Sequence, residues 1–203
     1  MNSSAIFKQN YDNYCTQLST IDFGKIEFIL DIHDNEVPFL GKKYFVSGDG
    51  IKGEDEQQAS YTVAIVIAQY ILQCPNELYL SNEWVSFKDF TSGAYTGTEL
   101  FMSKPQNSAK KLFTGKMDAL KKACETYGGK PLDMDVPYEV AYRFDILPRI
   151  SVVILFNDAD EDFPAQCKTL FQKHVEYYID PESLVIALGY LFNKLYKLTV
   201  NDG

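Results

Sequence analysis

The sequence lacks a surplus of positive charge. Its 19 Lys and Arg residues stand against 28 Asp and Glu residues, and the formal net charge is −9. An acidic surface repels the phosphates of nucleic acids, which are recognised through clustered Lys and Arg. The composition therefore argues against a nucleic-acid partner.

Long apolar runs are also missing. The longest, residues 63–68, is far shorter than the ~20 residues that a membrane-spanning helix needs. The first ten residues contain neither a basic segment nor an apolar segment of the kind found in signal peptides. We therefore expect a cytoplasmic protein that makes no membrane contact.

Closely spaced metal ligands are absent as well. The four cysteines, Cys15, Cys74, Cys124 and Cys167, form no C-x-x-C pair, so the chain has no local iron–sulfur or zinc motif. We expect buried free thiols. The only histidines, His33 and His174, lie in no H-E-x-x-H sequence. A Cys/His nucleophile assembled by folding stays open.

What is present suits one globular unit. The chain has 203 residues, 46% of them hydrophobic and 14% aromatic, which is enough for one well-packed core. No internal repeat or interdomain linker is visible. We therefore predict a single domain over residues 1–203.

Hydrophobic periodicity predicts most of the elements. Apolar residues at helical spacing predict a first helix over 4–19, and twelve nearly all-apolar residues predict a buried helix over 61–72. Alternation predicts a strand over 26–32, followed by a hairpin over 37–46 that breaks at Gly41. Further elements are predicted at 84–87 (a strand), 103–127 (one helix beginning with a capping box), 138–147 and 150–156 (strands joined by Pro148-Arg149) and 181–198 (a helix).

These elements define the fold class. No alternation of strand, helix and strand runs through the chain, so a parallel sheet is not expected. We predict an α+β fold in which an antiparallel sheet, built from strands near 25–46 and 138–156, is covered by helices.

Residues 48–53 form a G-x-G-x-x-G sequence of the kind that binds dinucleotide phosphates. The preceding strand belongs to an antiparallel hairpin, however, and three carboxylates (Glu54, Asp55 and Glu56) follow at once and would repel a phosphate. We therefore interpret the stretch as a loop before a buried helix and expect no dinucleotide site.

Two arginines are candidates for ligand recognition. Arg143 and Asp145 are two residues apart on one predicted strand, so they share a face. A two-residue turn at Pro148-Arg149 would place them opposite the apolar residues Ile154 and Val152, where a partly desolvated Arg143–Asp145 pair should couple strongly. The alternative is that Arg143, together with Arg149, recognises an anion in a cleft.

An acidic loop follows the second of these strands. Asp158, Asp160 and Asp162 have the spacing of the first three calcium ligands of an EF-hand, but the later positions carry Phe163 and Thr169 instead of Gly and Glu. The loop is therefore either a solvated contact surface that includes Phe163, or a divalent-metal site built on Asp158, Asp160, Glu161 and Asp162.

Four lysines form a basic stripe on the helix predicted over 103–127. Because eleven residues make three helical turns, Lys110, Lys111, Lys121 and Lys122 would lie on one face. Such a stripe is usually solvated, but on an acidic protein it can also dock an acidic partner.

From about Ala59 to residue 198 the chain resembles the family called domain of unknown function 3786, found mainly in anaerobic bacteria and archaea. The stretches that carry the resemblance are residues 62–72, 83–90, 141–171 and 176–191. Some relatives carry a small iron–sulfur domain, which implies a link to anaerobic redox or one-carbon metabolism. The resemblance implies no catalytic residues.

No catalytic motif stands out, so we expect a non-catalytic binding or accessory module whose cofactor is unknown. Its partner would be an unidentified protein or small molecule that contacts Arg143, Asp145, Arg149 and Phe163. The alternative is a metal-assisted hydrolase that uses the acidic loop at 158–162.

Overall fold

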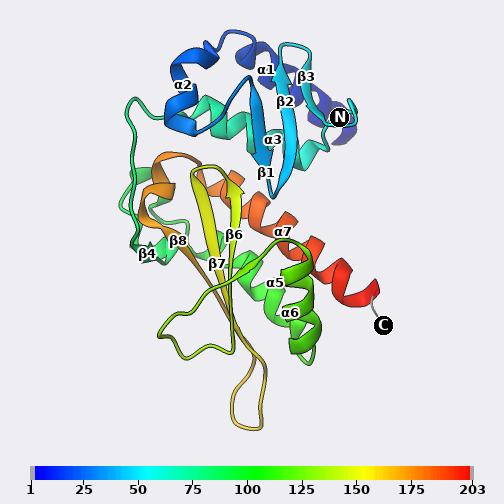
Figure 1. Ribbon diagram of the computed structural model, residues 1–203, viewed down its shortest axis with the longest axis vertical. Coiled ribbons are helices and arrows are strands. Elements are labelled where there is room, and N and C mark those ends of the chain that lie inside the picture. Colours follow the sequence, from blue (N-terminus) through cyan, green and yellow to red (C-terminus); the bar gives the residue numbers. More distant parts are fainter. Residues whose placement is uncertain (1–2, 202–203) are drawn as a thin grey trace.

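A computed structural model describes residues 3–201 (Figure 1). Its helices are α1 (Ser3–Leu18), α2 (Phe23–Leu30), α3 (Tyr61–Leu72), α4 (Glu99–Met102), α5 (Lys104–Phe113), α6 (Met117–Thr126) and α7 (Pro181–Asn201), with 3-10 turns η1 (Phe87–Asp89), η2 (Gly93–Tyr95) and η3 (Lys173–Tyr177). Its strands are β1 (Glu36–Phe39), β2 (Lys42–Ser47), β3 (Gly50–Gly53), β4 (Trp84–Val85), β5 (Lys130–Pro131), β6 (Val140–Leu147), β7 (Ile150–Asn157) and β8 (Gln166–Gln172).

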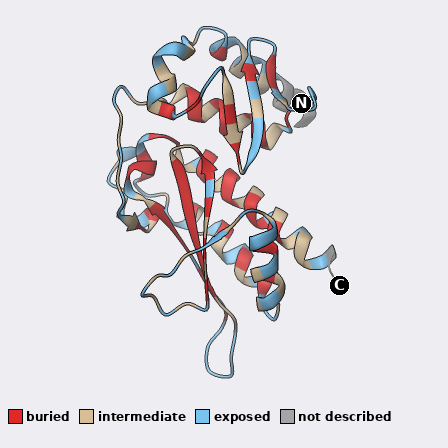
Figure 2. Cartoon of the chain, in the orientation of Figure 1, coloured by how far each residue is buried: buried red, intermediate tan, exposed pale blue. Residues whose placement is uncertain are grey.

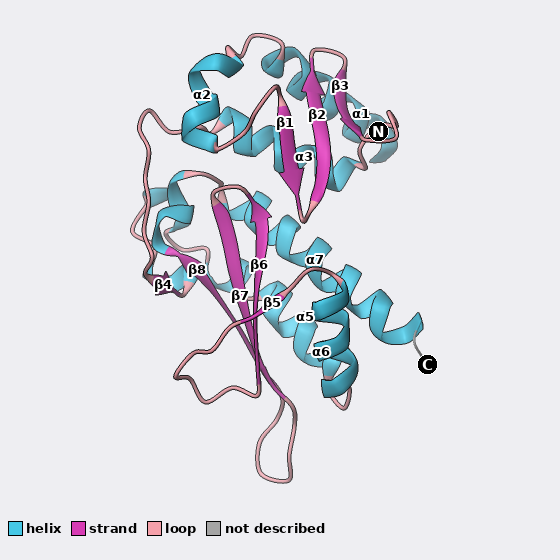
Figure 3. Ribbon diagram, in the orientation of Figure 1, coloured by secondary structure: helices cyan, strands magenta, loops and turns pink. Residues whose placement is uncertain are grey.

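The strands form two antiparallel sheets, with the orders β1-β2-β3 and β4-β8-β7-β6-β5 (Figure 3). The α+β fold class is therefore confirmed. The prediction of one sheet combining residues near 25–46 and 138–156 is wrong, because each group of strands pairs only within its own sheet in the described chain. The sheets meet where the Leu40 N–H donates to the Ile146 carbonyl at 2.9 Å.

The predicted strand over 26–32 is wrong, because residues 23–30 form helix α2. Ile26, Ile29 and Leu30 share one face at helical spacing and contact the core. Phe28, which strict alternation placed inside, is 74% exposed. The short stretch satisfies both periodicities, and the helix is the one that packs Ile29 against the core.

Residues 103–127 form two helices instead of the single predicted helix. Helix α5 ends at Phe113, the chain turns through Gly115, and α6 begins at Met117. The expected capping box is also absent, since the Ser103 hydroxyl donates to the Leu100 carbonyl. The predicted stripe of four lysines is therefore divided between two helices.

The G-x-G-x-x-G stretch is a β-hairpin and not a loop, since its second half is strand β3. Gly50 has φ +129°, and a Cβ at this residue would overlap the hydroxyl of Tyr11 on α1. The same hydroxyl accepts a hydrogen bond from the Ile51 N–H at 2.8 Å. The close approach of α1 therefore explains this glycine without a phosphate.

One hydrophobic core runs from the three-stranded sheet through α3 to the five-stranded sheet and α7 (Figure 2). Strand β7 is buried along nearly its whole length, as its apolar sequence predicts. Val152, Ile154 and Phe156 face the main core, whereas Val153 and Leu155 join a smaller cluster on the opposite face of the sheet.

Candidate functional site

Strand pairing in the β6–β7 hairpin decides which residues lie beside Arg143 and Asp145. The turn at Pro148-Arg149 is confirmed, but the register shifts by one residue between Asp145 and Leu147. Arg143 consequently lies opposite Val153, and Asp145 lies opposite Ser151. The shift places a hydroxyl, and not the predicted apolar side chain, beside the carboxylate.

Arg143 is held by a network of polar contacts. Its Nε donates to Asp145 Oδ1 at 3.0 Å, and its Nη2 donates to Ser151 Oγ at 3.1 Å. Lys130 contacts the other carboxylate oxygen of Asp145 at 3.1 Å, and the guanidinium carbon lies 6.0 Å from the Trp84 ring centroid. Partial burial alone would raise the pKa of Asp145, but hydrogen bonds from Ser151, Lys130 and Arg143 outweigh it and lower that pKa.

Solvent exposure limits the strength of the Arg143–Asp145 pair. The two side chains are 39% and 43% exposed. Pairs that water reaches to this degree typically couple by at most about 1 kcal/mol. The predicted contact is present, and its exposure favours weak coupling over the strong coupling expected for a desolvated pair.

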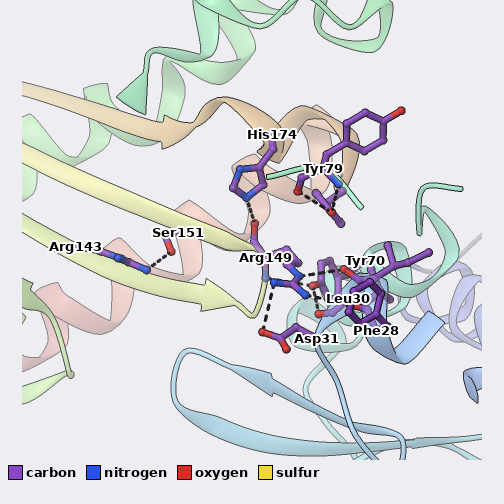
Figure 4. A network of polar contacts seen from close by, with 11 residues as sticks. Phe28, Leu30, Asp31, Tyr70, Tyr79, Arg143, Arg149, Ser151 and His174 are labelled. Carbon is purple, nitrogen blue, oxygen red and sulfur yellow. Dashed lines mark hydrogen bonds and ion pairs between the residues drawn. The ribbon is translucent and has the colours of Figure 1, made fainter. Parts of the chain in front are cut away.

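Arg149 lies in the β6–β7 turn, and its side chain caps the C-terminal end of helix α2. Its Nε and Nη2 donate to the carbonyls of Ile29 and Phe28, both at 3.0 Å, and Asp31 lies 3.6 Å from Nη1 (Figure 4). The side chain is only 17% exposed. A cation at the C-terminal end of a helix is favourable because it satisfies carbonyls that have no partner within the helix. The guanidinium of Arg149 therefore has a structural role.

The main chain of Arg149 is also bound on both sides. Its N–H donates to the Tyr70 hydroxyl at 3.2 Å, and that hydroxyl donates to the Leu30 carbonyl at 2.7 Å. Its carbonyl accepts a hydrogen bond from His174 Nε2 at 3.1 Å. The turn is thereby fixed to α2, α3 and η3 at once.

His174 has both ring nitrogens occupied. The Ser81 N–H donates to Nδ1 at 2.9 Å, so Nδ1 carries no proton and the proton on Nε2 points to Arg149 O. Burial lowers the pKa of His174 below its ordinary value. The imidazole is therefore a neutral structural link at pH 7.

These residues line a pocket of about 390 Å³. Both predicted arginines contribute to it, and so does His174, whereas Asp145 is not among the lining residues. The remaining lining residues, none of which was predicted as a site residue, are Leu80, Ser81, Asn82, Pro148, Ser151 and Gln172. No Asp or Glu belongs to the lining, although the chain carries a net charge of −9.

Side chains in and just after η3 hold two segments of the preceding loop, one near Ser81 and one at residues 91–92. The Tyr178 hydroxyl accepts from the Tyr79 N–H and donates to the Tyr79 carbonyl, both at 2.9 Å. The buried carboxylate of Glu176 accepts hydrogen bonds from the N–H groups of Thr91 and Ser92. One wall of the pocket is thus a loop that is fixed by side chains from elsewhere in the chain.

The acidic loop lies at the other end of β7, about 25 Å from the pocket by the length of an eight-residue strand. Asp158 accepts hydrogen bonds from the Gly115 N–H, and Asp160 Oδ1 accepts from the N–H groups of Asp162 and Phe163. Phe163 is 63% exposed. The structure does not bring the arginines and this loop together.

No group of three or more His, Cys, Asp or Glu side chains within residues 3–201 is arranged to hold a metal ion. Glu161 has no hydrogen bond to another described residue, and it does not line the nearby pocket that Glu139, Asp158 and Asp160 form with uncharged residues. Burial raises the pKa of both Cys124 and Cys167 to about 12, so they are protonated thiols at pH 7.

Comparison with known proteins shows the family. A family model described as "Domain of unknown function (DUF3786)" matches residues 26–194, and the chain belongs to this family. The match begins well before Ala59, so it includes the three-stranded sheet. No curated protein and no solved structure gives a significant match. Within residues 3–201, no helix combines the length and apolar character needed to cross a bilayer.

Proposed function

We propose that this protein is a non-catalytic binding module that recognises an oxyanion, a carboxylate or phosphate group, in the pocket beside Arg143. The proposal depends on how the Arg143 guanidinium is held and on which of its donors is free. This guanidinium is oriented by Asp145 and Ser151, it lines a pocket without Asp or Glu, and its Nη1 makes no hydrogen bond to a described residue.

The two arginines have different parts in this proposal. Arg149 makes the pocket more positive, but its donors are used by the end of α2. Arg143 has a free donor and a planar guanidinium that suits the two oxygens of a carboxylate or phosphate. Because Arg143 is already held in place, binding would cost little side-chain entropy.

The state of the polar groups supports binding over catalysis. A general base needs a free lone pair near the substrate, and the lone pair of His174 is occupied by the Ser81 N–H. The buried cysteines are protonated and therefore weak nucleophiles. For the alternative hydrolase, Asp158 and Asp160 accept hydrogen bonds from main-chain N–H groups, and no described ligand converges on them.

A thermal-shift titration with inorganic phosphate and with succinate tests the proposal. We expect either anion to raise the melting temperature of the wild-type chain, by the equivalent of about 2.7 kcal/mol at one hundred times Kd. Arg143→Met should remove this response. Lys130→Met is the matched control, since it deletes a cation that contacts Asp145 without lining the pocket.

The proposal is wrong if neither anion stabilises the wild type, or if Arg143→Met responds as the wild type does. An equal loss of response in Lys130→Met would indicate a general charge effect instead of a site. Any protein partner would then be sought at the exposed Phe163. The cytoplasmic location and the link to anaerobic redox or one-carbon metabolism stay predictions from the sequence.

A further inference from the structure

A second pocket, of about 500 Å³, lies between α5 and α7, away from the Arg143 site. Its apolar lining comes from Pro105 and Leu112 on α5 and from Val185 and Phe192 on α7. We call this pocket the α5–α7 groove. It is more apolar than the Arg143 pocket, and none of its lining residues is acidic.

Gly189 is the unusual residue of the groove. It lies in the interior of α7, a helix of 21 residues, where glycine is a poor helix former. A Cβ at this position would meet no atom within 4 Å, so packing inside the described chain does not require glycine. The absence of a side chain leaves open space at the middle of the groove.

The length and charge of the groove fit one kind of occupant. Each helix contributes residues over about two turns, 104–112 and 185–193, which is roughly 12 Å. Lys104 and Lys111 lie seven residues apart on the α5 side, so their spacing along the axis is about 10.5 Å. An amphipathic helix presents apolar anchors and acidic side chains at the same repeat.

We propose that the α5–α7 groove binds an acidic amphipathic helix of a partner protein. Its apolar face would lie on the partly buried Leu112 and Val185, above the buried Phe192 at the base of the groove. Its backbone would approach over Gly189, and its carboxylates would pair with Lys104 and Lys111. Lys111 belongs to the predicted basic stripe, and Lys104 does not. The proposal assigns both lysines to one binding surface. This proposal does not depend on the oxyanion pocket.

The test measures fluorescence anisotropy of labelled synthetic peptides of about 14 residues, roughly four helical turns. The acidic set carries Leu at i, i+3 and i+7 with Glu pairs seven residues apart, placed on either flank. One control set replaces Glu with Lys, and another scrambles the same composition. We expect the best acidic peptide to bind at least about tenfold more tightly than either control.

Variants of the protein locate the binding. Gly189→Leu fills the groove and should weaken the best peptide at least about tenfold, and Lys111→Glu should weaken it while improving the Lys peptide. Lys25→Glu makes the same charge change on α2 and should leave binding unchanged. Gly189→Ala should raise the unfolding midpoint, since alanine is the better helix former, and weaken binding less than Leu does.

Several results would overturn the proposal. One is an acidic set that binds no better than the scrambled set, and another is a Gly189→Leu chain with a native circular dichroism spectrum and unchanged affinity. If Gly189→Leu misfolds, the exposed Lys111→Glu variant decides. A dimer in sedimentation that Gly189→Leu abolishes would assign the groove to a second copy of the chain, against the proposal.

Discussion

Replacing Arg149 with Met should destabilise the protein far more than the same change at Arg143. Arg149→Met removes two hydrogen bonds from a charged donor to the carbonyls of Phe28 and Ile29. Such bonds contribute about 1.5–3 kcal/mol each. Water can reach the Phe28 carbonyl, so we take the lower part of the range, about 3 kcal/mol for both. The contact with the half-exposed Asp31 adds little.

The assay is urea denaturation followed by far-UV circular dichroism, with the melting temperature as a second readout. A loss of about 3 kcal/mol corresponds to a fall of roughly 6–12 °C for a chain of this length. Arg143→Met is the control, with an expected loss under about 1 kcal/mol. Arg149→Lys should lie between, because one ammonium cannot reproduce both bonds. An Arg149→Met loss no larger than that of Arg143→Met would refute the assignment of Arg149 to the fold.

Two further predictions concern the same hairpin. In a double-mutant cycle, Arg143→Met and Asp145→Asn should couple by no more than about 1 kcal/mol, because both side chains are over a third exposed; a coupling near 3 kcal/mol would contradict this. The lowered pKa of His174 means that its contribution to stability is complete above about pH 6.5 and is lost as the pH falls from there toward the folded-state pKa. His174→Gln can keep both hydrogen bonds without titrating, so its stability should decline less than that of the wild type between pH 7 and 5, and parallel curves would contradict the neutral-imidazole assignment.

The elements that could be predicted from the sequence are those whose hydrophobic pattern is compatible with only one kind of secondary structure. Helix α3 is apolar nearly all round over twelve residues, and α7 begins with a cap at Asp180 and Pro181, so both were correctly placed. The prediction for the α2 segment was wrong because its eight residues are compatible with both the helical and the strand periodicity. The choice between them depends on which face meets the core.

Strand β8 shows a signal that was present but not used. Cys167, Thr169 and Phe171 alternate with Lys168, and the three alternating residues are buried. The acidic loop before this strand connects β7 to β8, which pair antiparallel. The alternation in residues 166–172 would have been enough to predict this strand.

The pocket could be predicted only in part. Arg143 and Arg149 are close in sequence, so a shared site was a reasonable expectation, and the turn brings them together. What local patterns cannot show is that the Arg149 side chain reaches α2, 120 residues earlier in the chain, or that Ser81 fixes the ring of His174. Contacts between segments so distant in sequence depend on the tertiary fold alone.

Arg149 stabilises the fold and Arg143 faces the ligand, so substitutions of the two residues should affect ligand binding differently. Arg149 fixes the β6–β7 turn through its side chain and through both of its main-chain polar groups, so it determines where Arg143 and Ser151 stand. It has few donors left for an anion. An Arg149→Lys chain that still folds should therefore keep its stabilisation by phosphate or succinate, whereas a folded Arg143→Met chain should lose it. If the Arg149 variant alone lost the response, the ligand would be bound at the turn itself, and the guanidinium of Arg149 would have to exchange its helix carbonyls for the anion.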